Sequence, residues 1–152
     1  MKEISHLLRL AYLNILAPLV VEGVTIPISD SFINPNQTIP NFRSGQAYVL
    51  LADQNEVETS NNFCGFRQTA TISLDVITKF PNGSGSKLAS ELISNVIQTQ
   101  VNLLNGQSIN IAETDIQVLS TTKVSSQSFE EPGQSLVVFR KRITFSHILI
   151  QS

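Results

Sequence analysis

A glycine-rich segment between a predicted strand and a predicted helix is the local pattern best suited to binding a ligand. It reads Gly-Ser-Gly-Ser-Lys from Gly83 to Lys87, with Gly85 as its second glycine. Glycines before a helix N-terminus present backbone N–H groups to an anion, and a lysine adds positive charge. The segment lacks the spacing of the nucleotide-binding loop, which has four residues between its first glycine and Gly-Lys-Ser/Thr. A turn followed by a helix cap has the same composition. We favour that interpretation over a weak anion site at Gly83, Gly85 and Lys87.

The two histidines and the single cysteine do not form a recognisable catalytic or metal site. His6 and His147 have no Asp or Cys at ligand spacing. His147 shares a predicted strand face with Phe145 and Leu149, so we expect a core or interface histidine rather than a general base. Cys64 would need a histidine beside it to act as a nucleophile, which leaves a small hydrolase as one alternative. One cysteine excludes an internal disulfide and a Cys-rich zinc site. We expect no catalytic residue, no metal and no cofactor.

A basic cluster, Arg140-Lys141-Arg142, lies in the last predicted strand. Alternate residues of a strand point to opposite faces, so Arg140 and Arg142 share the face that points away from the core. They can pair with a neighbouring subunit, pair with Asp75 or Glu113 of the same chain, or line a channel through which phosphate passes. A solvated polar face is the simplest alternative.

Length and composition fit a single domain. The chain has 152 residues, which is enough for a self-sufficient core. Charged residues make up 14% of it and hydrophobic residues 41%, whereas an average domain carries about 25% charge. A surface low in charge suits contact with other subunits, although a compositional habit of the source explains it equally well. The net charge of −2 gives no whole-chain signal for nucleic acid or anionic membrane. No apolar stretch reaches the roughly 18 residues of a membrane span.

Hydrophobic periodicity predicts two helices and several strands. The helices, each with an apolar stripe, cover residues 2–17 and Ser86–Leu104. The strands are Leu19–Ile28 with a turn or bulge at Glu22-Gly23, Ala47–Ala52, Gln68–Phe80, Asp115–Ser125 and Leu136–Ile150, the last two joined by a turn at Glu130–Gln134. We therefore predict an α+β fold in one domain over residues 1–152. It has a mostly antiparallel sheet of four to five strands, with an N-terminal helix and one long helix packed on one face.

The alternation in three of the strands predicts which of their residues are buried. Two other segments are predicted to be long loops. The residues expected on the inner face are Ala70, Ile72, Leu74, Val76 and Phe80 in one strand, Ile116, Val118 and Val124 in the next, and Val137, Phe139, Ile143, Phe145 and Leu149 in the last. The loops are 29–46 and 53–63. Loops of this length are uncommon in a compact domain unless they have a function or stay disordered.

The order of these features resembles the tail terminator, or tail completion, proteins of tailed bacteriophages and the related ring proteins of the phage neck. The similar features are an N-terminal helix over Glu3–Leu16, a short strand over Ala47–Leu51, a long strand over Thr69–Thr78, a helix over Lys87–Leu104 and a closing strand pair that ends in Arg140–Phe145. The similarity covers most of the chain and lies in the pattern of elements.

The resemblance implies a structural virion protein, assembled in the cytoplasm of the bacterial host, that forms a ring of usually six subunits. Such a ring caps the finished tail tube, contacts head or neck connector proteins and lets DNA pass, without catalysis and without a membrane. The resemblance implies an intersubunit or lumen surface at Arg140, Arg142 and Asp75. It also implies that the two long loops contact partners, through Phe32, Asn36, Phe42, Arg43, Val57 and Phe63.

The main alternative function is a small-molecule or peptide-binding α+β module with its anion site at Gly83–Lys87. That module predicts a concave pocket and a stable monomer or dimer. A ring protein instead predicts association into closed oligomers.

Overall fold

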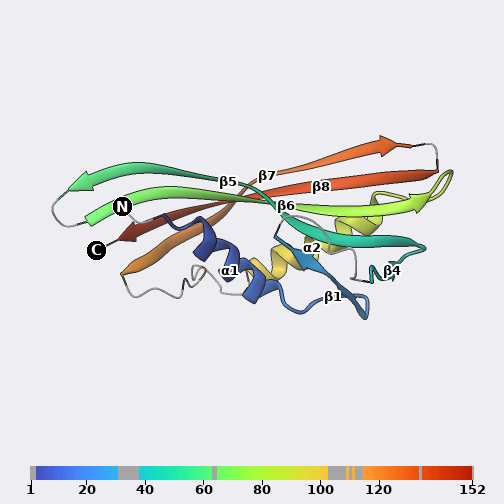
Figure 1. Ribbon diagram of the computed structural model, residues 1–152, viewed down its shortest axis with the longest axis horizontal. Helices are drawn as coiled ribbons and strands as arrows, with labels where there is room; N and C mark the ends of the chain where they lie inside the picture. The colour runs from blue at the N-terminus through green and yellow to red at the C-terminus, as the bar shows by residue number, and fades with distance from the viewer. Residues whose placement is uncertain are drawn as a thin grey trace.

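Four long antiparallel strands form the body of the computed structural model, which describes residues 3–30, 38–62, 65–102, 109, 111, 115–133 and 135–151. These strands are β5 (Gly45–Asn62), β6 (Gly65–Pro81), β7 (Ile116–Pro132) and β8 (Leu136–Gln151). They lie in the order β5-β6-β8-β7. In Figure 1, β5 forms the upper edge of the sheet at the left end and β7 forms it at the right end, so the sheet is strongly twisted along its length.

Short strands and two helices complete the fold. β3 (Ile28–Ser29) pairs with β5 in parallel and β4 (Asn41–Phe42) pairs with it antiparallel, which makes the main sheet six-stranded and mixed. β1 (Leu19–Val21) and β2 (Val24–Ile26) form a separate hairpin. The helices α1 (Ser5–Leu16) and α2 (Leu88–Asn102) lie on the same side of the sheet as this hairpin (Figure 1). The α+β class is confirmed, but the predicted sheet of four to five strands is too small. Two-residue strands such as β3 and β4 are too short to produce a periodic signal.

The core lies between the helices and one face of the sheet. The inner-face residues predicted for β6 and β8 are all buried: Ala70, Ile72, Leu74, Val76, Phe80, Val137, Phe139, Ile143, Phe145 and Leu149. Burial of each large apolar side chain contributes roughly 1.5–3 kcal/mol before entropy is counted. We call the opposite face, which neither helix covers, the open face of the sheet.

The prediction of a loop over 53–63 is wrong for the residues that the structure describes. Residues 53–62 form the outer half of β5 and pair with β6 from Gln54 opposite Ile72 to Asn62 opposite Gly65. No alternation of apolar residues marks this half-strand, because Val57 itself is 51% exposed and no apolar face is buried there. A register shift between Leu51 and Gln54 interrupts the pattern further. In the other predicted loop, 29–46, part of the segment forms β3, β4 and the start of β5.

β7 is longer and less regular than predicted. It extends to Pro132 rather than Ser125, so the predicted turn at 130–134 begins later. Ile116 and Val118 are buried as predicted, whereas Val124 is 60% exposed. Register shifts between Val118 and Ser120 and between Lys123 and Ser125 explain the error. Each bulge adds a residue, which reverses the face to which the following side chains point.

Both helices are confirmed with slightly narrower bounds. On α1, Leu8, Ala11 and Leu16 are buried, as their helical spacing predicts. On α2, Leu88 and Ile93 both lie at the helical spacing of the apolar stripe, but Ile93 is buried whereas Leu88 at the first position is 45% exposed. Of the turn or bulge predicted at Glu22-Gly23 within Leu19–Ile28, the structure shows a turn between β1 and β2, where Glu22 and Gly23 have φ angles of +49° and +79°. Such positive values suit the two central residues of a tight hairpin turn.

Candidate functional site

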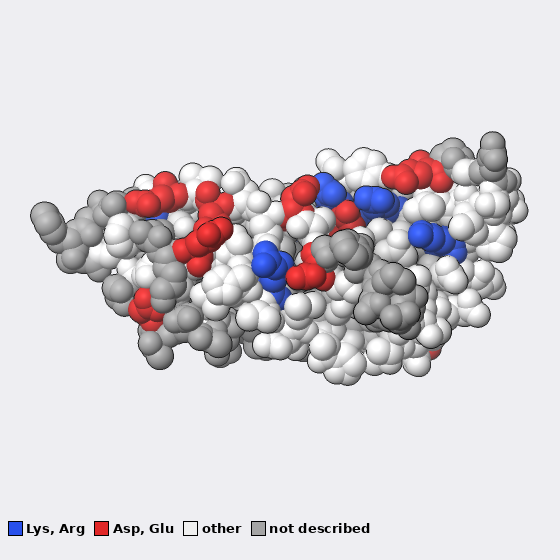
Figure 2. Space-filling view, in the orientation of Figure 1, with Lys and Arg blue, Asp and Glu red and all other residues white. Residues whose placement is uncertain are grey.

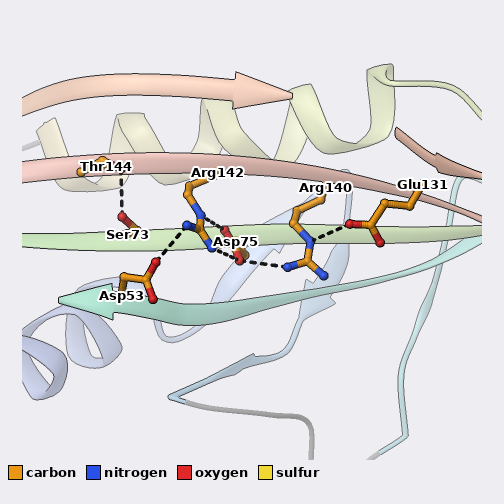
Figure 3. A network of polar contacts seen from close by, with 7 residues as sticks. All are labelled: Asp53, Ser73, Asp75, Glu131, Arg140, Arg142 and Thr144. Atoms are coloured by element: carbon orange, nitrogen blue, oxygen red, sulfur yellow. Dashed lines mark hydrogen bonds and ion pairs between the residues drawn. The ribbon is translucent and has the colours of Figure 1, made fainter. Parts of the chain in front are cut away.

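The strongest polar cluster of the described residues lies on the open face, around the carboxylate of Asp75. Arg142 donates two hydrogen bonds to it, from Nε to Oδ1 at 2.8 Å and from Nη2 to Oδ2 at 3.0 Å. The two residues are directly opposite in the β6–β8 register. The Asp75 side chain is only 4% exposed, so this two-pronged contact is shielded from solvent. Figure 3 shows the guanidinium facing the carboxylate edge to edge.

A second carboxylate, that of Asp53, also contacts Arg142. Asp53 accepts a 2.9 Å hydrogen bond from Nη1 of Arg142, although its own side chain is 79% exposed. The hydrogen bonds that Arg142 donates to Asp75 are the main reason why the pKa of Arg142 is raised above its ordinary value. Arg142 therefore stays charged and donates three hydrogen bonds to carboxylates of its own chain. Of the alternatives open from the sequence, pairing with Asp75 is the one that the structure shows, while Glu113 lies outside the described residues.

Arg140 is held more loosely than Arg142. Its Nη1 lies 3.4 Å from Oδ2 of Asp75, and its Nε lies 3.8 Å from Oε1 of Glu131. The second distance is an ion pair without a hydrogen bond, and the buried Nε of Arg140 has no hydrogen-bond partner among the described residues. Arg140 is therefore held by one long hydrogen bond and one long ion pair, in contrast to Arg142.

His147 is a core residue, as predicted. It is fully buried, and burial lowers its pKa to about 4. Its Nδ1 lies 2.9 Å from the carbonyl oxygen of Ala70 and its Nε2 lies 2.7 Å from the hydroxyl of Tyr12. A carbonyl only accepts, so Nδ1 carries the proton and Nε2 accepts from Tyr12. Burial raises the pKa of Tyr12 as well, which keeps its hydroxyl a donor. The pair is neutral and satisfied, and so unsuited to general-base chemistry with an external substrate.

The glycine-rich segment is explained by its backbone. Gly83 and Gly85 have φ angles of +83° and +94°, and a Cβ at Gly85 would lie 2.3 Å from the ring of Phe80. Ser84 donates hydrogen bonds to the carbonyl oxygen of Pro81 from both its backbone N–H and its hydroxyl. The two glycines therefore serve a turn and a close approach to an aromatic ring. This geometry favours the turn interpretation over an anion site.

The residues predicted to contact partners lie in different environments. Phe42 is 2% exposed and belongs to the core, whereas Val57 is exposed. Arg43 forms an exposed, two-pronged pair with Glu22 at 2.6 and 3.1 Å. Phe32, Asn36 and Phe63 lie outside the described residues, as does Cys64.

The outer half of β5 contacts the start of α1, and no local sequence pattern predicts this contact. Oε1 of Glu56 accepts hydrogen bonds from the backbone N–H of Ile4 at 3.0 Å and from the hydroxyl of Ser5 at 2.7 Å. Gln54 joins the same helix by accepting from Arg9 and donating to the carbonyl oxygen of Ser5. A carboxylate thus caps α1, whose own first turn contains no acidic residue.

A metal site is not found in the described part of the chain. No three His, Cys, Asp or Glu residues gather there in a way that would hold a metal ion. An open hollow of about 360 Å³ on the open face is lined by Thr59, Arg67, Thr69 and Ile148, with no histidine or carboxylate among them. No helix among the described residues has the length and apolar character needed to cross a membrane.

The described residues thus form an α+β fold with a salt-bridged open face and a buried, neutral His147. No protein-family model matches the chain, and no curated protein matches it. Among solved structures, it is similar to a chain in the virion of a native gene transfer agent particle, with a TM-score of 0.67 and 11% sequence identity. The alignment covers 99% of this chain and 99% of that chain. The likeness shows that the two chains share a fold from end to end.

Proposed function

We propose that this chain is a structural virion protein that forms a ring at the head-proximal end of a phage tail or in the neck. The resemblance to tail terminator proteins implies six subunits in this ring. The observation that carries the proposal is the end-to-end fold likeness to a chain of a virion particle. Coverage of 99% of both chains means that no extra domain accounts for the match. The order of elements that resembles tail terminator proteins supports the same conclusion independently of that comparison.

The distribution of charge supports a role in assembly. Charged residues make up only 14% of the chain, and in Figure 2 they gather over the sheet while the surface below it is mostly uncharged. Interfaces between subunits are depleted of charge at their centres. A surface of this kind suits a protein that is enclosed by other subunits over much of its area.

The paired arginines are compatible with a passage for DNA. A surface that binds phosphate strongly would hold DNA rather than let it move, because phosphate contacts dominate affinity. Arg142 is neutralised by Asp75 and Asp53, and Arg140 lies near Asp75 and Glu131. An open face that lines the ring would therefore be polar with little excess positive charge. The head connector and the tail tube are the partners at the two ends of such a ring.

Mass photometry over a concentration series, combined with negative-stain imaging, tests the proposal, with and without magnesium. We expect closed rings of one subunit number that become more abundant as concentration rises. Ring closure requires the same contact to repeat by rotation, so particles of uniform size are the informative result. Stable monomers or dimers at every concentration, together with a small molecule that raises the unfolding temperature, would favour the binding-module alternative instead.

A further inference from the structure

The main sheet has two free edges among the described residues. β3 pairs with β5 only as far as Leu50, so the outer half of β5 has β6 as its one described strand partner. β7 is the last strand in the sheet order and pairs only with β8 in the described part of the chain. In Figure 1 these two edges form the upper border of the sheet at its left and right ends. A free edge presents backbone N–H and C=O groups with which another strand can pair.

The second half of β7 presents a defined set of backbone groups at its free edge. The N–H of Gly133 donates to the carbonyl oxygen of Leu136 at 2.9 Å, so these two residues form a hydrogen-bonded pair. Hydrogen-bonded and non-hydrogen-bonded pairs alternate along antiparallel strands, and the β7–β8 register is regular over 125–132. The residues of this stretch whose backbone groups point away from β8 are therefore Ser126, Ser128 and Glu130.

The outer half of β5 presents an equivalent set. The N–H of Val49 donates to the carbonyl oxygen of Pro27 at 2.9 Å, so it points away from β6. Val49 lies opposite Val76, and every second residue of β6 from Val76 to Gln68 is likewise directed away from β5. The residues of β5 opposite these positions, beyond the register shift that follows Leu51, are Gln54, Glu56 and Glu58.

Both sets lie on the face of the sheet that the helices cover. Glu130 is opposite Phe139, and Gln54 is opposite Ile72, two residues whose side chains are buried in the core. Residues directly opposite each other in a ladder share a face. Joining the two edges therefore continues the open face of one copy into the open face of the next. All three residues of the β7 set are exposed, so no helix blocks a strand that approaches there.

The two edges can meet only between copies, because β6 and β8 lie between them in one chain. Each neighbouring pair in the order β5-β6-β8-β7 is antiparallel, so β5 and β7 run in opposite directions. Rotation about an axis along the strands preserves strand direction, which makes β5 of the next copy antiparallel to β7 of the first. The free stretches lie at opposite ends of the molecule (Figure 1), so neighbouring copies are staggered, as closure of a sheet requires.

We propose that residues 126–130 of β7 in one copy pair with residues 54–58 of β5 in the next copy. This inference rests on the proposed ring and names the backbone groups that join its subunits. A shift of the register by two residues would place Glu130 opposite Glu56, and like charges directly opposite each other are destabilising. The register that uses all three free positions of each strand avoids this: Ser126 is opposite Glu58, Ser128 opposite Glu56 and Glu130 opposite Gln54.

The same register gives a contact to two exposed apolar side chains. Val57 is 51% exposed and Phe129 is 44% exposed. Both lie on the open face, since Val57 is opposite Thr69 and Phe129 is opposite Arg140. The proposed pairing makes them diagonal neighbours, at a separation of about 7–8 Å that an aromatic side chain can span. Pairing of the edges therefore buries apolar surface as well as backbone groups.

A proline substitution in the full chain tests the pairing. Ser128→Pro removes an N–H that points away from β8, and proline is tolerated at such positions of edge strands. Urea unfolding should show a folded chain, while mass photometry should show association weakened about 10-fold or more, which is the upper value of one backbone hydrogen bond. Ser128→Ala keeps the N–H and is the matched control, which should associate like the natural sequence. Equal association of the two variants would overturn the inference.

Amide hydrogen exchange measures the same pairing without a substitution, and it decides the matter if Ser128→Pro does not fold. On association, the amide of Gln127 should not change, because it already points toward β8. Protection that is absent from the monomer should appear at Ser126, Ser128, Glu130, Gln54, Glu56 and Glu58. Protection of only two residues in each set would contradict the register.

The outcomes separate this inference from the proposed function. If rings form and none of the six amides gains protection, the edges are wrong and the proposed ring stands. A chain that stays monomeric at every concentration also overturns the edge pairing. The proposed function fails with it only if the chain is absent from purified particles.

Discussion

Acid should destabilise this protein through one buried histidine. His147 is held neutral in the core by Tyr12 and the carbonyl group of Ala70, and burial lowers its pKa to about 4 from an ordinary value of 6.5. The unfolded chain takes up a proton near pH 6.5, whereas the folded chain takes it up only near pH 4. Between these values the unfolded state binds more protons, so stability falls as the pH falls. The full gap corresponds to about 3 kcal/mol.

Urea unfolding followed by circular dichroism measures this loss. Relative to pH 7.5, the free energy of unfolding at pH 4.5 should include a loss of about 2–3 kcal/mol from His147. Acidic residues add their own pH dependence, so the comparison is made with His147→Gln. Glutamine can donate to Ala70 and accept from Tyr12 but does not titrate. The difference between the two pH profiles isolates the contribution of the imidazole.

The only other histidine supplies the control. His6 is exposed on α1, so His6→Gln should keep the pH profile of the natural sequence while His147→Gln flattens it between pH 6.5 and 4. If His147→Gln and the natural sequence lose stability in parallel over this range, His147 is not held neutral and the reasoning about the core is wrong.

Three further changes test the polar contacts and the glycine turn. Asp75→Asn should cost about 2–3 kcal/mol in urea unfolding, because it removes a buried, charged acceptor from two arginines, while the exposed Asp53→Asn should cost less than about 0.5 kcal/mol; equal losses would contradict the assigned centre of the cluster. Glu56→Ala should cost about 1–2 kcal/mol and increase amide exchange in the first turn of α1, since it removes the cap; unchanged exchange there would show that the cap contributes nothing. Gly85→Ala should lower the unfolding temperature more than Gly83→Ala, because both need positive φ but only a Cβ at Gly85 meets the ring of Phe80; the reverse order would contradict the packing argument.

The parts of the fold predicted from the sequence are those with one buried face. In β6 and β8 the residues of one face are mostly apolar, because the helices cover that side of both strands, and every inner residue predicted for them is buried. The hairpin turn at Glu22-Gly23 follows from local backbone chemistry and is present. These signals are local, so they survive without knowledge of the tertiary structure.

The parts that were missed depend on distant pairing. The outer half of β5 is a strand because β6 pairs with it, although its own residues bury no apolar face. The cap of α1 comes from Glu56, about fifty positions away in the chain. Arg142 pairs with Asp75 because the β6–β8 register places them opposite each other, whereas the sequence left Asp75 as one of several partners. Registers and bulges of this kind are set by the assembled sheet.

Immunogold labelling of purified particles tests the central proposal most directly, with antibody raised against this chain. The proposal predicts label concentrated at one point per particle, at the junction between head and tail. Its quantity should correspond to a single ring, as measured by quantitative mass spectrometry against the other virion proteins. Absence of the chain from purified particles, or label spread along the whole tail, would contradict the account.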